Sequence, residues 1–264
     1  MKKRDYSLTE GIIWKSILFF AVPIMLSNLL QQLYSAVDSS IVGIFAGSMP
    51  LAAVGSSGAL INLLVGFFLG ISTGTSVIFA KYFGADDKKK LLKTMNTSII
   101  LSSIAGIIIT IVGMIWTKSL LEFMHCPEDV IDLSVMYLRV YFLGIVGMMI
   151  YNVGAGIIRA RGDSKHPLYY LFVSGVLNLV LDILFVAVFN MGVAGAAFAT
   201  VISQYVSAAL VIINLMNIPD MLSYMNDIRV LYWCYPASWI FCSICFIIYY
   251  LRGRWLTNSL QSEY

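Results

Sequence analysis

Charged and amide side chains occur inside apolar stretches of the chain, where burying them is costly. Asn178 and Asp182 lie in the apolar run 171–204, four residues apart, so a helix would place both on one face. A carboxylate inside a bilayer costs several kcal/mol and is by default a candidate functional residue. We therefore expect Asp182 to face water, a cation or a proton; the alternative is a structural carboxyl group that bonds to neighbouring helices.

A second carboxylate, Asp38, ends a polar stripe on another apolar segment. Three further polar residues precede it at spacings of three and four, namely Ser27, Gln31 and Tyr34. At a rise of about 1.5 Å per residue, Asp38, Asp182 and Thr200 all reach the outer half of a membrane. Two carboxylates in one pocket of low dielectric do not both ionise easily. The sequence therefore predicts a proton site, or a sodium site completed by hydroxyl, amide and carbonyl oxygens.

The composition indicates a membrane protein. Of 264 residues, 59% are hydrophobic and only 12% are charged, against about 25% charged in a soluble domain. Several apolar runs exceed the roughly 20 residues that cross a bilayer, and they alternate too little for an outer-membrane barrel. We predict an all-α, polytopic membrane helical bundle that is not an enzyme, needs no cofactor and binds no nucleic acid. His125 and His166 lie in loops with no partner at metal-binding spacing.

Six spans are expected in residues 1–217. Their approximate bounds are 13–42, 51–79, 97–116, 133–158, 168–189 and 196–215. Pro23 lies inside the first span and should bend it. The second span carries glycines four apart, which predict close helix packing there. A polar junction at 218–229 and a seventh apolar segment in 230–264 follow.

The loop charges predict the orientation of the chain. Twelve basic residues lie in segments on the same side as the N-terminus, against Lys118 alone in the opposite loops. Because basic residues stay on the cytoplasmic side, we expect a cytoplasmic N-terminus in the plasma membrane. Arg252 and Arg254 after the seventh segment break this rule, unless an odd number of spans is missing before it.

Four blocks of sequence resemble one transporter family. They are PIMLSNLLQQLYSAVDSSIVG (23–43), LAAVGSSGAL (51–60), GIIRARGDSKHPLYY (156–170) and NLVLDILFVAVFNMGVAGAAFATVISQ (178–204). The family is that of the multidrug and toxic compound extrusion (MATE) transporters. The resemblance implies a twelve-span antiporter of two six-span lobes, which exports cationic and amphipathic compounds in exchange for sodium ions or protons.

The same resemblance assigns roles to individual residues. It implies a coupling-ion site, for a proton or a sodium ion, at Asp38, Asn178, Asp182 and Thr200. Asn152 and Tyr137 are looser additions to that site. Pro23 matches the proline whose bend is proposed to respond to protonation.

The chain departs from the family pattern because only one lobe, 1–217, is evident. Residues 231–256 resemble the family's last span, so five spans are missing from the middle. A homodimer is one way to complete the transporter. The alternatives are a membrane fragment that does not transport, and a flippase for lipid-linked precursors. A flippase needs a cationic cavity, and Arg139 is the one arginine or lysine well inside a predicted span.

Overall fold

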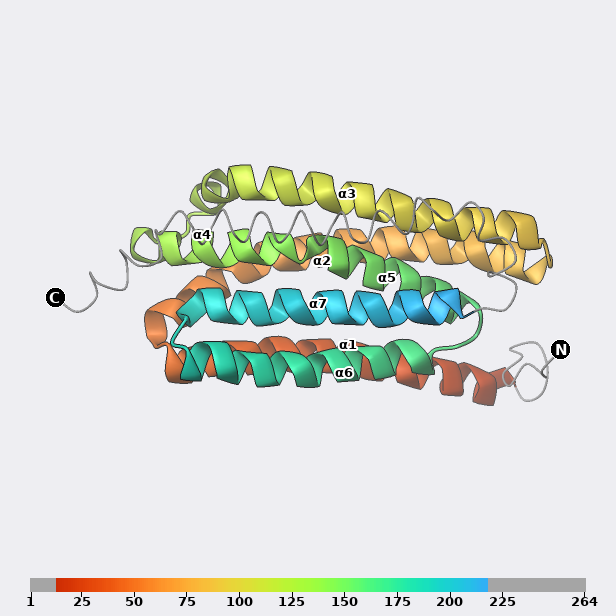
Figure 1. Cartoon of the computed structure of the whole chain (residues 1–264), viewed down its shortest axis with the longest axis horizontal. Helices are drawn as coiled ribbons and strands as arrows, with labels where there is room; N and C mark the ends of the chain where they lie inside the picture. The colour runs from red at the N-terminus through yellow and green to blue at the C-terminus, as the bar shows by residue number, and fades with distance from the viewer. Residues whose placement is uncertain (1–12, 218–264) are drawn as a thin grey trace. The chain divides into compact units, whose positions relative to one another are not determined.

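The computed structural model describes residues 13–217, and every regular element in that part of the chain is a helix. In chain order the elements are α1 (Ile13–Phe45), α2 (Ser48–Gly84), α3 (Lys88–Phe123), α4 (Glu128–Leu143), α5 (Ile145–Ala160), α6 (Lys165–Asp182), the π-helix η1 (Ile183–Val188) and α7 (Gly192–Met216) (Figure 1). The predicted junction at 218–229 and the last span in 230–264 lie outside the described residues.

The helices agree with the predicted fold class. Five of them are long and apolar enough to cross a membrane, and there are six spans if α4 and α5 count as one broken span. The described part of the chain is therefore an all-α, polytopic membrane bundle, as predicted.

One helix extends well past its predicted span, because polar residues continue it beyond the apolar segment. The helix predicted at 97–116 runs from Lys88 to Phe123. Its first turn is capped by Asp87, which accepts a hydrogen bond from the backbone N–H of Lys90 at 3.1 Å and pairs with the Lys90 ammonium at 3.0 Å. These contacts, led by the backbone hydrogen bond, hold the pKa of Asp87 below its ordinary value.

The segment predicted as one span at 133–158 consists of two helices, which are bent by 48° at Gly144. A Cβ atom on Gly144 would lie 2.2 Å from Oε1 of Gln204, so the side chain of α7 occupies that space. Thr110 of α3 donates to the carbonyl of Phe142 at 2.8 Å, and Tyr205 of α7 donates to that of Leu143 at 2.9 Å. Side-chain hydroxyls thus bond to the carbonyls beside the break.

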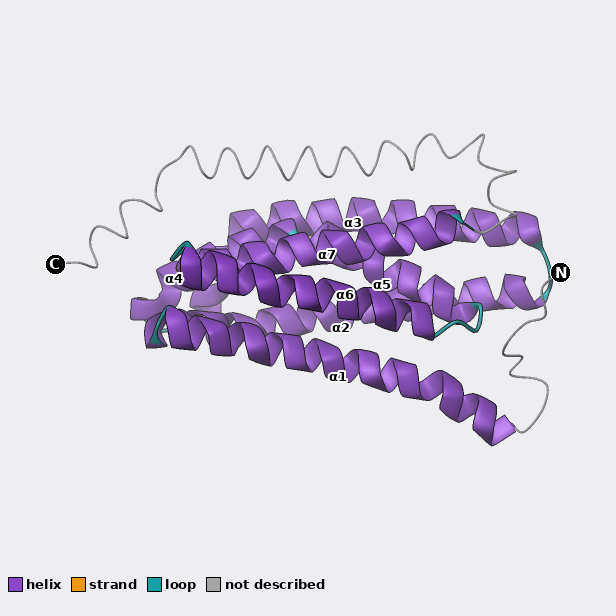
Figure 2. Ribbon diagram, turned by 60° about the horizontal axis from the view of Figure 1, so that its bottom comes forward, coloured by secondary structure: helices purple, strands orange, loops and turns teal. Residues whose placement is uncertain are grey.

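The core of the bundle lies on α5. Every residue from 145 to 158 is buried, because α5 packs against α2, α3 and α7 at once. On the other side of α7, α6 packs against both α7 and α1, and the two views show α1 and α6 running along one another (Figure 1, Figure 2). Most of α1 is exposed beyond this contact.

The predicted close packing of the α2 glycines is wrong for the described residues. A Cβ atom on any of these glycines would meet no atom within 4 Å: Gly55, Gly58, Gly66, Gly70 and Gly74. Close approach occurs instead at glycines on other helices, such as Gly113 against the Phe142 ring and Gly175 against the Tyr34 ring. Four-residue spacing permits close packing, but the glycines have to lie on the face that meets the partner helix.

Candidate functional site

The site lies along the contact between α1 and α6. The Tyr34 hydroxyl of α1 donates to the carbonyl of Leu171 on α6 at 3.1 Å, and the Tyr34 ring lies directly over Gly175. Asp38 is one turn further along α1, and Asp182 is at the last residue of α6. The two helices therefore bring both carboxylates to the same end of their contact.

Asp38 contacts two of the other predicted site residues. Thr200 of α7 donates to Oδ2 of Asp38 at 3.3 Å, and the carboxyl groups of Asp38 and Asp182 lie within hydrogen-bonding reach of each other. Asp182 has no exposed surface, and neither of its oxygens receives a hydrogen bond from the described residues. Oδ1 of Asp38 is likewise buried without a donor. Two acids this close in a pocket of low dielectric do not both ionise easily.

A cavity of about 240 Å³ opens beside Asp38. Side chains from α1, α2 and α4 to α7 line it, and most of the polar ones are neutral. Asp38 is the one carboxylate among the lining residues, and no lysine, arginine or histidine reaches the cavity from the described part of the chain. Asp182 is not among the residues that line it. The cavity wall therefore favours cations over anions.

Asn178, Asn152 and Tyr137 also line this cavity, and they differ in how their side chains are held. Asn178 is buried, and its amide nitrogen has no acceptor among residues 13–217. Asn152 is held by its neighbours. Its side-chain amide donates to the backbone carbonyl of Met148 at 2.8 Å, and its backbone carbonyl accepts a hydrogen bond from the Ser72 hydroxyl at 2.6 Å. The ring centroid of Tyr137 lies 6.1 Å from that of Tyr141.

Pro23 lies apart from the cavity. It is buried within α1, which continues through it as one helix, and the Ser27 hydroxyl donates to the Pro23 carbonyl at 2.8 Å. The other three residues of the predicted polar stripe on α1 do line the cavity: Gln31, Tyr34 and Asp38.

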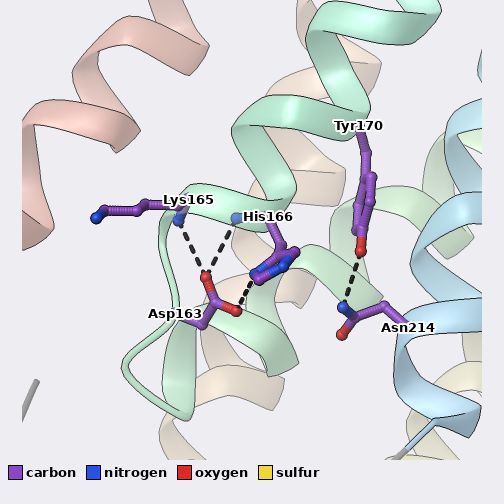
Figure 3. Close-up of polar contacts among 5 residues, drawn as sticks. All are labelled: Asp163, Lys165, His166, Tyr170 and Asn214. Carbon is purple, nitrogen blue, oxygen red and sulfur yellow. Dashed lines mark hydrogen bonds and ion pairs between the residues drawn. The ribbon is translucent and has the colours of Figure 1, made fainter. Parts of the chain in front are cut away.

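Polar contacts at the start of α6 fix the helix that carries Asp182 (Figure 3). Asp163 accepts hydrogen bonds from the backbone N–H groups of Lys165 and His166, both at 3.1 Å, and its other oxygen contacts the His166 ring. One turn later, Asn214 of α7 donates to the Tyr170 hydroxyl at 2.8 Å. The carboxylate caps the first turn of α6, and the amide joins α6 to α7.

The sequence analysis did not single out several residues of the cavity wall. Tyr141 and Met148 flank the break at Gly144, and the Tyr141 hydroxyl lies 3.8 Å from the Met148 sulfur. Asn62 reaches the cavity from α2. Tyr141 follows Tyr137 by four residues and shares its helix face, so the spacing alone was a usable signal.

The oxygen atoms around Asp38 suit a hard cation or a proton. Carboxylate, hydroxyl and amide oxygens are the ligands that sodium-like cations prefer. No group of three or more histidine, cysteine, aspartate or glutamate side chains gathers within the described residues. The site accordingly offers two acids and neutral oxygens rather than a transition-metal ligand set.

Comparison with known proteins identifies the class of fold. The family profile described as MatE matches residues 23–184. The probable multidrug resistance protein YpnP of Bacillus subtilis (strain 168) is 35% identical over 201 residues, which are 76% of this chain and 45% of that protein. YoeA of the same organism, also described as a probable multidrug resistance protein, is 33% identical over 82% of this chain and 48% of its own length.

Solved structures agree with the sequence relatives. A crystal structure of MATE in the straight conformation matches with a TM-score of 0.74 and 31% identity, over 82% of this chain and 48% of that one. A transporter of the MOP superfamily from Pyrococcus furiosus matches with a TM-score of 0.76 and 28% identity, over 96% of this chain. The fold is thus that of a polytopic membrane transporter.

The chain belongs to the MATE family. It spans about half the length of the curated relatives it matches.

Proposed function

We propose that this chain is the ion-binding part of a cation-coupled antiporter, which exports drugs and other organic cations in exchange for sodium ions or protons. The observation that carries the proposal is the contact of Asp38 with both Asp182 and Thr200 at the wall of the cavity. The names of the relatives, which describe multidrug resistance and multidrug export proteins, support the same function.

The coupling ion binds between the two carboxyl groups. A proton shared by Asp38 and Asp182 leaves one net charge on the pair, and a sodium ion neutralises one charge in the same place. Thr200 contributes its hydroxyl oxygen, and Asn178 lies one turn before Asp182 on the same face of α6. Loss of the ion leaves two charges in contact, which favours a different arrangement of α1 against α6.

The exported compound binds in the cavity beside the ion. The wall carries tyrosine rings, neutral amides and the Asp38 carboxylate, without a basic side chain. Aromatic faces and a carboxylate attract organic cations, whereas a basic group would repel them. The coupling ion and the organic cation therefore compete for the negative charge of Asp38. This competition links the two fluxes.

We further propose that the protein lies in the plasma membrane with its N-terminus in the cytoplasm; the loop charges support the cytoplasmic N-terminus. A second copy of the chain is the partner that we propose for the lobe 1–217. The two alternatives, a fragment that does not transport and a flippase for lipid-linked precursors, are not favoured by the named relatives.

The ion site is tested by the thermal stability of the purified protein. We expect sodium ions or a lower pH to raise the melting temperature of the wild-type chain, and Asp182→Asn to lose this response. Asp87→Asn is the matched control for the sodium titration at constant pH, because Asp87 lies outside the spans at the start of α3, and it should respond to sodium like the wild type. A wild-type chain that responds to neither cation would refute the ion site.

Transport is tested separately by ethidium efflux from a bacterium that lacks its own pumps. The proposal predicts faster efflux with the wild-type chain than with Asp182→Asn. A cation response without any efflux would instead favour the non-transporting fragment.

A further inference from the structure

The connection between α6 and α7 contains a π-helix that begins directly after Asp182. This element, η1, covers Ile183–Val188. The backbone N–H of Phe189 bonds to the carbonyl of Leu184 at 2.9 Å, five residues back, and that of Met191 bonds to the carbonyl of Phe185 at 2.9 Å. A π-turn holds one residue more than an α-turn, and single π-turns inside α-helices occur often at functional sites.

The first turn of α7 packs closely on η1 at Gly195. A Cβ atom on Gly195 would lie 3.0 Å from the Cβ of Phe185 and 3.1 Å from its carbonyl carbon. Val186 on the inner side of η1 is 1% exposed, whereas Leu184 faces outward and is 36% exposed. The backbone of η1 is therefore fixed against α7, while the Leu184 side chain contributes little to the packing of the interior.

Asp182 and Thr200 lie on opposite sides of this connection, yet both contact Asp38. Asp182 ends α6 immediately before η1, and Thr200 follows Gly195 by five residues on α7. One residue of an α-helix corresponds to about 100° of rotation. Without the additional residue of the π-turn, α7 could not keep its packing at Gly195 while α6 keeps the same face toward α1. Either Asp182 or Thr200 would then turn away from Asp38.

We infer that η1 and Gly195 set the register that holds Asp182 and Thr200 against Asp38 at the same time. Gly195 and the additional residue are positioning elements; they do not touch the ion. The inference rests on the proposed function, because it assigns the register a role in cation binding.

The length of η1 is the variable to change. Deletion of Leu184 removes one residue from η1 without removing its buried side chain, Val186, and Leu184→Ala is the control with unchanged length. We expect the deletion to abolish the cation-dependent rise in melting temperature, and Leu184→Ala to keep it. A third variant combines the deletion with one alanine inserted between Ala187 and Val188; it restores the residue count, and we expect it to regain the response.

Gly195→Ala tests the same inference without changing the chain length, and it carries the test if the deletion does not fold. The added methyl group pushes η1 away from α7, and misplacing a group that orients a ligand typically weakens cation affinity by about tenfold or more. We expect the cation concentration at half effect to rise by that factor. Gly58→Ala is the control, because a Cβ atom there meets nothing within 4 Å.

The outcomes separate the two proposals. If the wild-type protein responds to no cation, the proposed ion site itself fails. If the wild-type protein responds, and both the Leu184 deletion and Gly195→Ala keep its cation concentration at half effect, the ion site stands and the register inference is overturned.

Discussion

Tyr34 of α1 lies in a notch on α6 that exists only because residue 175 is glycine. A Cβ atom on Gly175 would lie 1.8 Å from Cζ of Tyr34 and 2.2 Å from its hydroxyl oxygen. Asp38 follows Tyr34 by one turn, and Asp182 follows Gly175 by seven residues along the same face of α6. The notch therefore sets how closely α1 approaches α6 just before the two carboxyl groups meet.

Gly175→Ala should displace Tyr34 and loosen the contact between α1 and α6. Overpacking of this kind costs about 2 kcal/mol. The measurement is the free energy of unfolding in detergent, with Gly66→Ala on α2 as the control, because nothing lies within 4 Å of a Cβ atom at that position. Equal effects of the two substitutions would show that Tyr34 does not depend on the notch.

Thr200→Val should weaken the cation response while leaving the fold intact. Valine keeps the shape of the side chain but removes the hydroxyl that contacts Asp38. Because loss of one orienting group weakens cation affinity by roughly tenfold, a titration of melting temperature against cation concentration should shift by that factor. Thr200→Ser keeps the hydroxyl and should titrate like the wild type; an unshifted Thr200→Val would remove Thr200 from the site.

Thr110→Val should destabilise the break between α4 and α5. Thr110 is 1% exposed and its hydroxyl donates to the carbonyl of Phe142, so loss of the hydroxyl costs about 1 kcal/mol. Thr73→Val on α2 is the matched control, since the Thr73 hydroxyl bonds within its own helix on an exposed face. Chemical unfolding of both variants measures the difference, and a Thr73→Val protein that is equally destabilised would contradict the account.

Asp87→Ala should lower the melting temperature in a pH-dependent way. The pKa of Asp87 lies below its ordinary value, so the ionised carboxylate stabilises the folded chain above that value. As the pH falls through the lowered pKa, the carboxylate takes up a proton and this contribution is lost. The difference between wild type and Asp87→Ala should therefore shrink below about pH 4. A difference that stays constant down to that range would mean that the cap acts without its charge.

The spans and the acidic residues could be predicted from the sequence, because each depends on local pattern. Apolar runs longer than a bilayer indicate helices wherever they occur, and a carboxylate such as Asp182 stands out within one. The spacing of Asn178 and Asp182 predicts a shared face, and both lie on the inner side of α6 in the structure.

Other features depend on residues distant in the chain and were not predictable. At the break, the space beside Gly144 is filled by the side chain of Gln204, sixty residues later in the chain. The π-turn after Asp182 packs Phe185 against Gly195, ten residues later in the chain. The α2 glycines were predicted from local pattern and the prediction was wrong. Their spacing indicated close packing, but no atom of the described residues lies within 4 Å of a Cβ atom at these positions.

The most direct test of the central claim is a double-mutant cycle on Asp38 and Asp182. The cation-induced rise in melting temperature is measured for the wild type, Asp38→Asn, Asp182→Asn and the double variant. If the two carboxyl groups bind one cation together, each single substitution removes the whole response and the double variant loses nothing more. Single variants that each keep a part of the response, with losses that add up in the double variant, would contradict a shared site.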